Sequence, residues 1–220
     1  VKKYQITVRG DSENILVFPF FDEKDELRFI KYRKMDFDKE RDRSKEWCEA
    51  NCMPILYGMN QCTDRKRLVI TEGQIDSLSL VEAGIKNAVS VPTGANGFTW
   101  IPHCWDWVNQ FEEIVVFGDY ENGNITLVDT IQRRFSHKKV LVVWEEDYNG
   151  CKDANEILQK FGRPSVAFAV EHARMLPVKQ IKELADVEAV DIEAMEHIKT
   201  NIPEVDQLIN GMYSVSYTHL

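Results

Sequence analysis

Short apolar runs alternate with amphipathic segments between residues 68 and 173. The runs that we predict to be strands cover 68–71, 87–91, 113–118 and 139–144, with an edge strand near 165–170. The segments with helical periodicity cover 75–83, 100–110, 123–135 and 153–161. Strands that alternate with helices of this length are typical of a parallel sheet with right-handed crossovers. We therefore predict an α/β fold for this part of the chain, with a parallel sheet and flanking helices.

The upstream segment has the two-residue alternation of a half-buried β-hairpin. An apolar strand over 15–21 is followed by a polar turn at 22–25 and an alternating strand over 26–33. We expect the basic side chains of the second strand to face largely outward. Its inward side chains are expected to be Leu27, Phe29 and Tyr32. Residues 36–47 are strongly charged and read as a loop, so the whole segment predicts a small β-rich subdomain.

Charge is unevenly distributed along the 220 residues, whose formal net charge is −9. Residues 1–67 carry a net +2, whereas residues 68–170 carry −6 and residues 171–220 carry −5. Within 28–45 there are eight basic and four acidic residues. A basic surface beside an acidic domain suits a metal-dependent enzyme that acts on a polyanion. The interleaved acids leave a second interpretation open, in which this stretch is only a solvated loop.

Membrane and secretory signals are absent from the sequence. No run of about 18 apolar residues is present, and the first residues lack the apolar core of a signal peptide. Five cysteines at irregular spacing are typical of reduced thiols. These observations predict a cytoplasmic protein with no membrane partner.

Glu72 follows the first apolar strand of the α/β region. It is succeeded by Gly73 and by a helix that begins near Gln74. In open α/β sheets the chemistry gathers at the carboxyl ends of the strands. Asp76 lies in the first helical turn, where it can cap backbone N–H groups, and we expect it to support the turn and orient the site.

A second acidic pair, Asp119 and Glu121, follows the strand at 113–118. The two residues are spaced i, i+2, so both side chains face one way if the backbone stays extended. Neighbouring parallel strands would bring this pair and Glu72 to the same edge of the sheet. Three carboxylates in one place repel one another unless a cation is present, and oxygen ligands suit Mg²⁺ or Mn²⁺. The alternative is that these acids cap helices and face water.

A third element, Lys152 to Glu156, opens the last predicted helix of the region. Asp153 is a good N-cap, and Glu156 three residues later makes a start that resembles a capping box. Lys152 would point toward the same edge of the sheet, where it could meet a phosphate. Capping alone also explains the segment.

Three tryptophans in the predicted helix at 100–110 have two interpretations. Trp100, Trp105 and Trp107 could offer stacking faces for bases. Aromatic side chains at this spacing are also typical of a core.

In this order and at these separations, three short motifs resemble the Toprim domain of primases, topoisomerases and certain nucleases. They are EGxxD at 72–76, an acidic DxE at 119–121 and KDAN at 152–155. The wider context resembles the primase half of phage-type and Twinkle-type primase–helicases. The matching segments there are FPFF at 18–21, KYR at 31–33, LYG at 56–58 and IPEVDQLING at 202–211.

The resemblance implies a DNA primase, which makes short RNA primers on a single-stranded DNA template from NTPs during DNA replication. It implies that Mg²⁺ or Mn²⁺ is held by the catalytic residues Glu72, Asp119 and Glu121. The residues implied to bind nucleotide or nucleic acid are Lys31, Arg33, Lys45 and Lys152. The supporting residues are Gly73, Asp76 and Asp153. A replicative helicase domain in the same full-length protein is the expected partner.

The chain also departs from this pattern. Glu121 replaces an aspartate, so the second ligand reaches one methylene further. The sequence has no GxxxxGK[ST] phosphate loop, and Cys48, Cys52 and Cys62 lack the paired spacing of a zinc ribbon. Because the chain begins at Val1 without an initiator methionine, we expect it to be a fragment of a longer protein.

Two rival functions stay open at this point. One is a Toprim nuclease that uses the same metal ligands with water as nucleophile, and the other is a non-catalytic DNA-binding or assembly module. Under each of these readings the predicted domains are a small basic β-rich subdomain over 1–66, a Toprim domain over 67–173, and an acidic linker with the start of a helicase-like domain over 174–220.

Overall fold

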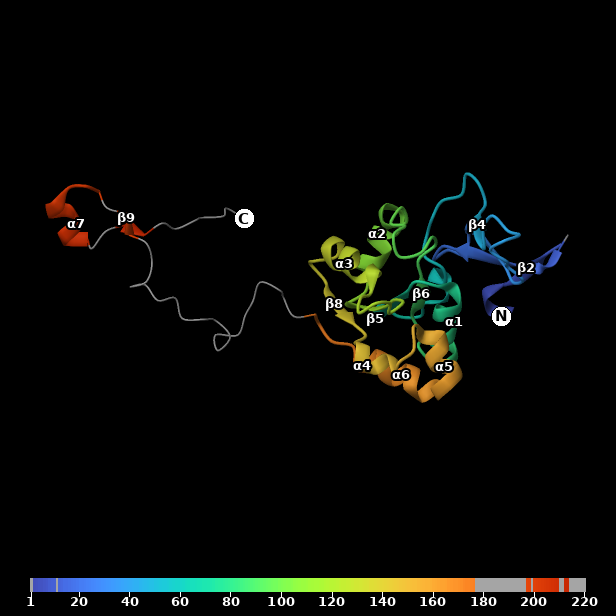
Figure 1. Ribbon diagram of the computed structural model, residues 1–220. Helices are drawn as coiled ribbons and strands as arrows, with labels where there is room; N and C mark the ends of the chain where they lie inside the picture. Colours follow the sequence, from blue (N-terminus) through green and yellow to red (C-terminus); the bar gives the residue numbers. More distant parts are fainter. Residues whose placement is uncertain (1, 11, 177–196, 199, 210–211, 214–220) are drawn as a thin grey trace. The chain divides into compact units, whose positions relative to one another are not determined.

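The apolar strands of the α/β region form one parallel sheet (Figure 1). The computed structural model describes residues 2–10, 12–176, 197–198, 200–209 and 212–213. The strand order is β6-β5-β7-β8, and every neighbouring pair is parallel. The strands are β5 (Arg67–Thr71), β6 (Ala88–Ser90), β7 (Glu113–Phe117) and β8 (Lys139–Val142). This sheet confirms the predicted fold class.

Helices cover both faces of this sheet (Figure 1). One face carries α1, α4, α5 and α6, with α1 against α5 and α5 against α6, and the other carries α2 and α3. The helices are α1 (Gln74–Glu82), α2 (Ile101–Asn109), α3 (Thr126–Arg134), α4 (Glu145–Tyr148), α5 (Ala154–Phe161) and α6 (Arg163–Glu171). The predicted alternation of strands and helices is therefore present from residue 67 to residue 161.

The predicted edge strand at 165–170 is wrong, because these residues lie in α6. Pro164 stands in the first turn of that helix, where its missing N–H costs nothing. Val166, Ala169 and Val170 are buried at a helical spacing of three and four residues. The short helix α4 was not predicted, since four residues are too few for a periodic signal.

An antiparallel sheet precedes the α/β region, in the order β1-β2-β3-β4. Its strands are β1 (Thr7–Arg9), β2 (Ser12–Phe21), β3 (Leu27–Lys34) and β4 (Glu46–Cys48). The β2–β3 pairing confirms the predicted hairpin, while β4 takes two residues of the predicted loop. Two short 3₁₀ helices are η1 (Lys2–Tyr4) and η2 (Met59–Gln61).

Two side chains of β3 differ from the prediction in how far they are buried. Leu27 is 51% exposed, although we expected it inside. Lys31 is 5% exposed, although we expected the basic side chains outside. Phe29 and Lys31 have the same parity in the strand, so the inward face that begins with Phe29 continues to an amine rather than to an apolar residue.

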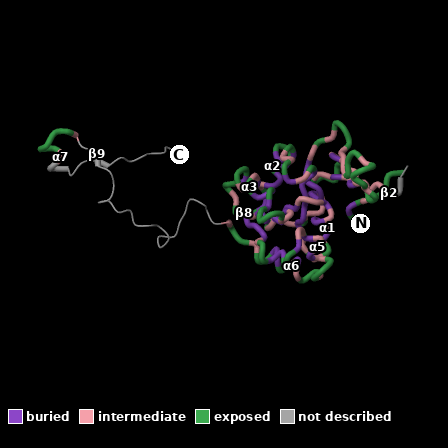
Figure 2. Tube along the Cα trace, viewed as in Figure 1, coloured by how far each residue is buried: buried purple, intermediate pink, exposed green. Residues whose placement is uncertain are grey.

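Aromatic packing joins the two sheets. Phe18 and Phe20 of β2 contact the ring of Tyr57 edge-on, with ring centroids 5.9 and 5.0 Å apart. Tyr57 forms a β-bridge to Ser90 at the end of β6. The three aromatic residues belong to one cluster of buried apolar side chains, and Figure 2 shows the buried parts of the chain in purple. The small sheet therefore lies beside the carboxyl end of the central sheet, and residues 1–176 form one compact unit.

Two of the three tryptophans belong to the core. Trp100 is 0% exposed and Trp107 is 4% exposed, and both indole N–H groups are buried without a hydrogen-bond partner. Trp105 is half-buried and stacks on Phe135, with ring centroids 4.9 Å apart. The core interpretation is confirmed for Trp100 and Trp107, because neither offers a free face to a base.

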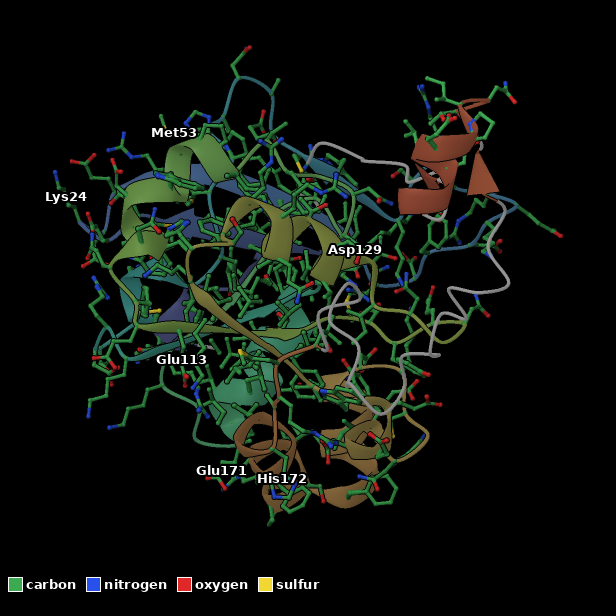
Figure 3. The ribbon with its side chains drawn as sticks, turned by 90° about the vertical axis from the view of Figure 1, so that its left-hand side faces the viewer. Lys24, Met53, Glu113, Asp129, Glu171 and His172 are labelled. Carbon is green, nitrogen blue, oxygen red and sulfur yellow. The ribbon has the colours of Figure 1, made fainter. Side chains whose placement is uncertain are left out.

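Salt bridges connect the amino ends of three strands of the central sheet. Glu113, labelled in Figure 3, begins β7 and forms salt bridges with Arg67 of β5 at 2.5 Å and with Lys139 of β8 at 2.8 Å. These three residues are in register across the sheet. At the opposite, carboxyl ends, acidic residues follow two neighbouring strands: Glu72 follows β5 and Asp119 follows β7.

Residues 177–220 form a second unit. Its described elements are β9 (His197–Ile198), which pairs with β10 (Met212–Tyr213), and α7 (Pro203–Ile209). The acidic linker that we predicted to begin at residue 174 lies mostly outside the described residues. The boundaries predicted at 66/67 and 173/174 stay predictions. Among the described helices, none is long and apolar enough to cross a membrane.

Candidate active site

Three aspartates from different parts of the chain meet at the carboxyl edge of the central sheet. One carboxylate oxygen from each of Asp76, Asp119 and Asp153 lies within 4.8 Å of the others. Asp76 comes from the first turn of α1, Asp119 follows β7, and Asp153 precedes α5. The parallel sheet places all three segments at one edge, which is the edge where the sequence predicts Asp119 to lie.

The turn after β5 brings Asp76 close to the backbone. A Cβ atom at Gly73 would lie 2.5 Å from Asp76 Oδ2, so only glycine leaves room for this carboxylate. The other oxygen, Oδ1, accepts a hydrogen bond from the backbone N–H of Asn155 at 3.1 Å. Asp76 thus connects the start of α1 to the start of α5.

Asp153 has the capping role that the sequence predicts. Its Oδ1 accepts a hydrogen bond from the N–H of Glu156 at 2.8 Å, and the Glu156 carboxylate accepts one from the N–H of Lys152 at 3.2 Å. These bonds satisfy two backbone donors at the start of α5. The cap also fixes the position of the Asp153 carboxylate beside Asp76.

Lys152 lies between the two acids that follow β7. Its Nζ is 3.1 Å from Asp119 Oδ2 and 2.5 Å from Glu121 Oε1. The side chain of Asp119 is 22% exposed, whereas that of Glu121 is 60% exposed. Lys152 therefore supplies positive charge to the acidic cluster itself.

Glu72 lies at the same edge, held by a loop that follows β6. Its Oε1 accepts a hydrogen bond from the N–H of Ala95 at 3.2 Å. Gly94, at φ +78°, lets the loop pass close to this carboxylate. The structure thus brings Glu72 and Asp119 to one cavity, while Glu121 lies outside the residues that line it.

Burial and mutual repulsion make the charged form of these acids costly. Burial, followed by the neighbouring Asp153, raises the pKa of Asp76 to about 7. Burial also raises the pKa of Glu72, and the charge of Asp119 adds to this effect. The pKa of Asp119 is raised by burial despite the opposing contact with Lys152. Such a group binds a proton or a cation readily, because either one relieves the cost of the buried charge.

A cavity of about 340 Å³ opens onto the acidic cluster. Its lining includes the carboxylates of Glu72, Asp76, Asp119 and Asp153 together with basic residues of the small sheet. Those basic residues are Lys31, Arg33 and Lys45. Lys152 joins them from the α/β side. Negative and positive groups therefore line one cavity, an arrangement that suits a cation together with an anionic ligand.

Three further residues contribute to the site without having been predicted in these roles. Glu46 lines the cavity and forms salt bridges with Lys31 and Arg33. Ala95 and Asn155 act through their backbone N–H groups. The identity of a side chain does not reveal a contact that is made by the backbone N–H. Glu46 is one of several acids in a charged stretch, so the sequence gives no reason to single it out. Only the KDAN motif, which contains Asn155, carried a sequence signal.

Residues 69–158 match the family model described as Toprim-like. The Primase homolog protein of Arabidopsis thaliana is 29% identical and aligns with 78% of this chain and 54% of its own length. The Twinkle homolog protein, chloroplastic/mitochondrial, of the same plant is also 29% identical, over 77% of this chain and 25% of its own length. The chain therefore spans about half of the first relative and a quarter of the second.

Solved structures of similar fold include the zinc-binding and RNA polymerase domains of the Aquifex aeolicus primase. That structure has a TM-score of 0.61 and 17% identity, over 74% of this chain and 41% of its own. The primase fragment of the bacteriophage T7 primase-helicase has a TM-score of 0.55 and 23% identity, over 71% of this chain and 62% of its own. At these identities the likeness establishes the fold alone.

Proposed function

We propose that this chain, whose residues 69–158 form a Toprim-like domain, is the catalytic core of a DNA primase. It would make short RNA primers on single-stranded DNA from NTPs by metal-dependent nucleotidyl transfer. The observation that carries this proposal is the single cavity that has carboxylates on one side and Lys31, Arg33 and Lys45 on the other. The two curated relatives and the solved primase folds support the same conclusion.

The donor set fits a hard divalent cation. The three clustered aspartates offer only oxygen ligands, which suit Mg²⁺ or Mn²⁺. The ligands expected from the sequence are Glu72, Asp119 and Glu121. Asp119 belongs to both sets, so we centre the proposed site on Asp119. Bound there, the ion would activate a hydroxyl nucleophile and neutralise charge on the phosphates.

The protein's own groups would bind and orient the reactants. Lys31 and Arg33 present N–H donors to the cavity, and Arg is suited to bidentate contacts with phosphate oxygens. Lys45 lies at the same wall and would hold phosphates of nucleotide or template. The backbone N–H of Ala95 holds the Glu72 carboxylate in place without neutralising its negative charge.

The proposed reaction forms one P–O bond and breaks another. The primer 3′-hydroxyl oxygen attacks the α-phosphorus of an NTP, the bond to the β-phosphate breaks, and pyrophosphate leaves. The hydroxyl proton passes to solvent. Because the reactants carry many negative charges, the basic wall lowers the electrostatic cost of bringing them together.

We also propose the setting in which this core works. A replicative helicase domain in the same full-length protein would be its partner, as the resemblance of residues 202–211 suggests. All five cysteines are free thiols, which supports a reducing compartment such as the cytoplasm.

Incubation with single-stranded DNA, labelled NTPs and Mg²⁺ or Mn²⁺ tests the proposed activity. We expect short labelled RNA that requires both the template and the metal. An Asp119→Asn variant should make none. Cleavage of the template without RNA synthesis would instead establish a Toprim nuclease. Metal binding with neither synthesis nor cleavage, in a chain tested together with its helicase partner, would favour a non-catalytic module.

A further inference from the structure

Glu46 bridges two of the three basic residues that the small sheet contributes to the cavity, Lys31 and Arg33. Its Oε2 lies 2.7 Å from Lys31 Nζ, and its Oε1 lies 3.1 Å from Arg33 Nη1. Glu46 and Arg33 are directly opposite each other in the β3–β4 pairing. One carboxylate thus engages both basic side chains across the strand pair.

The bridge provides the charge compensation that a buried lysine needs. The Lys31 side chain is 7% exposed, whereas the side chains of Arg33 and Glu46 are 29% and 32% exposed. Among the described residues, Glu46 is the one salt-bridge partner of Lys31. A buried ammonium without a counter-ion is costly, so some anion must accompany Lys31 in every state of the site.

The same donors would be needed by a phosphate group. Lys31, Arg33 and Glu46 all line the cavity that also contains Asp76, Asp119 and Asp153. A phosphate entering between the two walls meets a carboxylate that already occupies its binding partners. Its binding therefore requires that Lys31 and Arg33 exchange Glu46 for phosphate oxygens, or share them with it.

We propose that Glu46 is an internal competitor for phosphate anions at Lys31 and Arg33. An anion must carry enough negative charge to replace Glu46 at Lys31 and Arg33. The choice of phosphate as the ligand rests on the proposed function, but the competition itself depends only on the bridge and the cavity. Glu46 also keeps Lys31 paired when the cavity holds no anion.

Binding of inorganic pyrophosphate and orthophosphate by Glu46→Gln tests this role. Titration calorimetry is done at one fixed Mg²⁺ concentration and at several salt concentrations, without DNA or NTPs. Removal of one unit charge beside the anion site should tighten pyrophosphate binding about 5–10-fold. Orthophosphate carries less negative charge, so its binding should tighten less, and both effects should shrink as salt increases.

Two further variants keep the test decisive. Glu49→Gln removes an equal charge from an acid that accepts a hydrogen bond from Tyr32 and touches neither Lys31 nor Arg33, so its affinities should equal those of the unmodified chain. Glu46→Asp keeps the charge but shortens the side chain, which weakens the bridge and should tighten pyrophosphate binding about twofold. This variant carries the test if Glu46→Gln does not fold.

Unchanged or weaker pyrophosphate binding in the folded Glu46 variants would overturn the proposal, since Glu46 would then position the cations rather than compete. A lack of pyrophosphate binding in every variant would overturn it as well. RNA synthesis is not part of this measurement. A chain that makes no RNA but shows tighter binding in Glu46→Gln contradicts the proposed function and leaves the competition intact.

Discussion

The ammonium group of Lys152 lies 3.1 Å from the Asp119 carboxylate, at the place where the acidic cluster would hold a cation. The same Nζ contacts Glu121 at 2.5 Å. The hydrogen bond to Glu121, with the one to Asp119, raises the pKa of Lys152 above its usual value, so the residue stays charged at neutral pH. Lys152 is 43% exposed and can leave the acids without unfolding its surroundings.

Replacement of Lys152 should therefore change metal binding. A Lys152→Ala variant loses the internal cation, so the nucleotide-free protein should bind Mg²⁺ about 3–10-fold more tightly. The KM for NTPs should increase in the same variant, because a phosphate-binding charge is also lost. Calorimetry with MgCl₂ and steady-state kinetics measure the two effects. Lys152→Arg is the matched control. Weaker Mg²⁺ binding by Lys152→Ala would contradict the idea that Lys152 and Mg²⁺ compete for the same carboxylates.

A set of single amide substitutions can identify the carboxylates that hold the metal. Asp119→Asn should lower Mg²⁺ affinity and primer synthesis at least about 100-fold, more than the usual effect of losing a residue that only orients a ligand. Two further variants discriminate between the possible ligand sets. Asp76→Asn tests the three clustered aspartates, and Glu121→Gln tests the ligands that the sequence motifs imply. The variant with the greater loss of Mn²⁺ affinity, measured by paramagnetic relaxation of water protons, belongs to the ion's ligand set.

Asp129→Asn serves as the control for these substitutions. Asp129 lies in the first turn of α3 and is labelled in Figure 3. Its loss changes the net charge by the same amount without touching the acidic cluster. If this variant lost as much metal affinity as Asp119→Asn, the effect would reflect net charge rather than ligation.

The sheet and its order of helices could be predicted because they follow from local periodicity. The strand at 68–71 and the helix that begins near Gln74 were visible as an apolar run followed by helical spacing. The failure at 165–170 has a specific cause. The apolar residues of α6 fit a short strand pattern and a helix pattern equally well. Pro164 is the residue that favours the start of a helix there.

The sequence predicts only the part of the site that lies directly at the ends of strands. Residues 72 and 119 follow neighbouring strands, so their meeting follows from parallel pairing. The approach of Asp76 to Asp153 depends instead on how α1 packs against α5, which no pattern within either segment specifies. The burial of Lys31 likewise depends on its bridge to Glu46, a pairing set by the register of β4.

Gly73→Ala should damage the site more than the fold. The new Cβ would lie 2.5 Å from Asp76 Oδ2, so the carboxylate must leave its present position beside Asp119 and Asp153. We expect Mg²⁺ affinity to fall about tenfold, in the range of other changes that misorient a ligand, with the melting temperature nearly unchanged. Gly10→Ala, where nothing lies within 4 Å of the added atom, should leave both quantities unchanged.

The stability of the metal-free protein should depend on pH through Asp76. Burial and the neighbouring Asp153 raise the pKa of this carboxyl from 3.8 to about 7, so the folded state binds more protons than the unfolded state between these values. The free energy of unfolding in EDTA should therefore decrease as pH rises from about 4 to about 7, by at most about 4 kcal/mol, and then level off with respect to this group.

Magnesium and Asp76→Asn should each weaken that dependence. A bound cation stabilises the ionised carboxylate, so saturating Mg²⁺ should raise the melting temperature more at pH 8 than at pH 5. In Asp76→Asn the neutral amide needs no counter-ion, so the metal-free variant should be at least as stable as the unmodified chain at pH 8 and should lose most of the slope. Urea unfolding at five pH values measures the stability of the variant and the pH slope, and thermal melts at pH 5 and pH 8, with and without Mg²⁺, measure the change in melting temperature. An equal slope in the variant would assign the pH dependence to other groups.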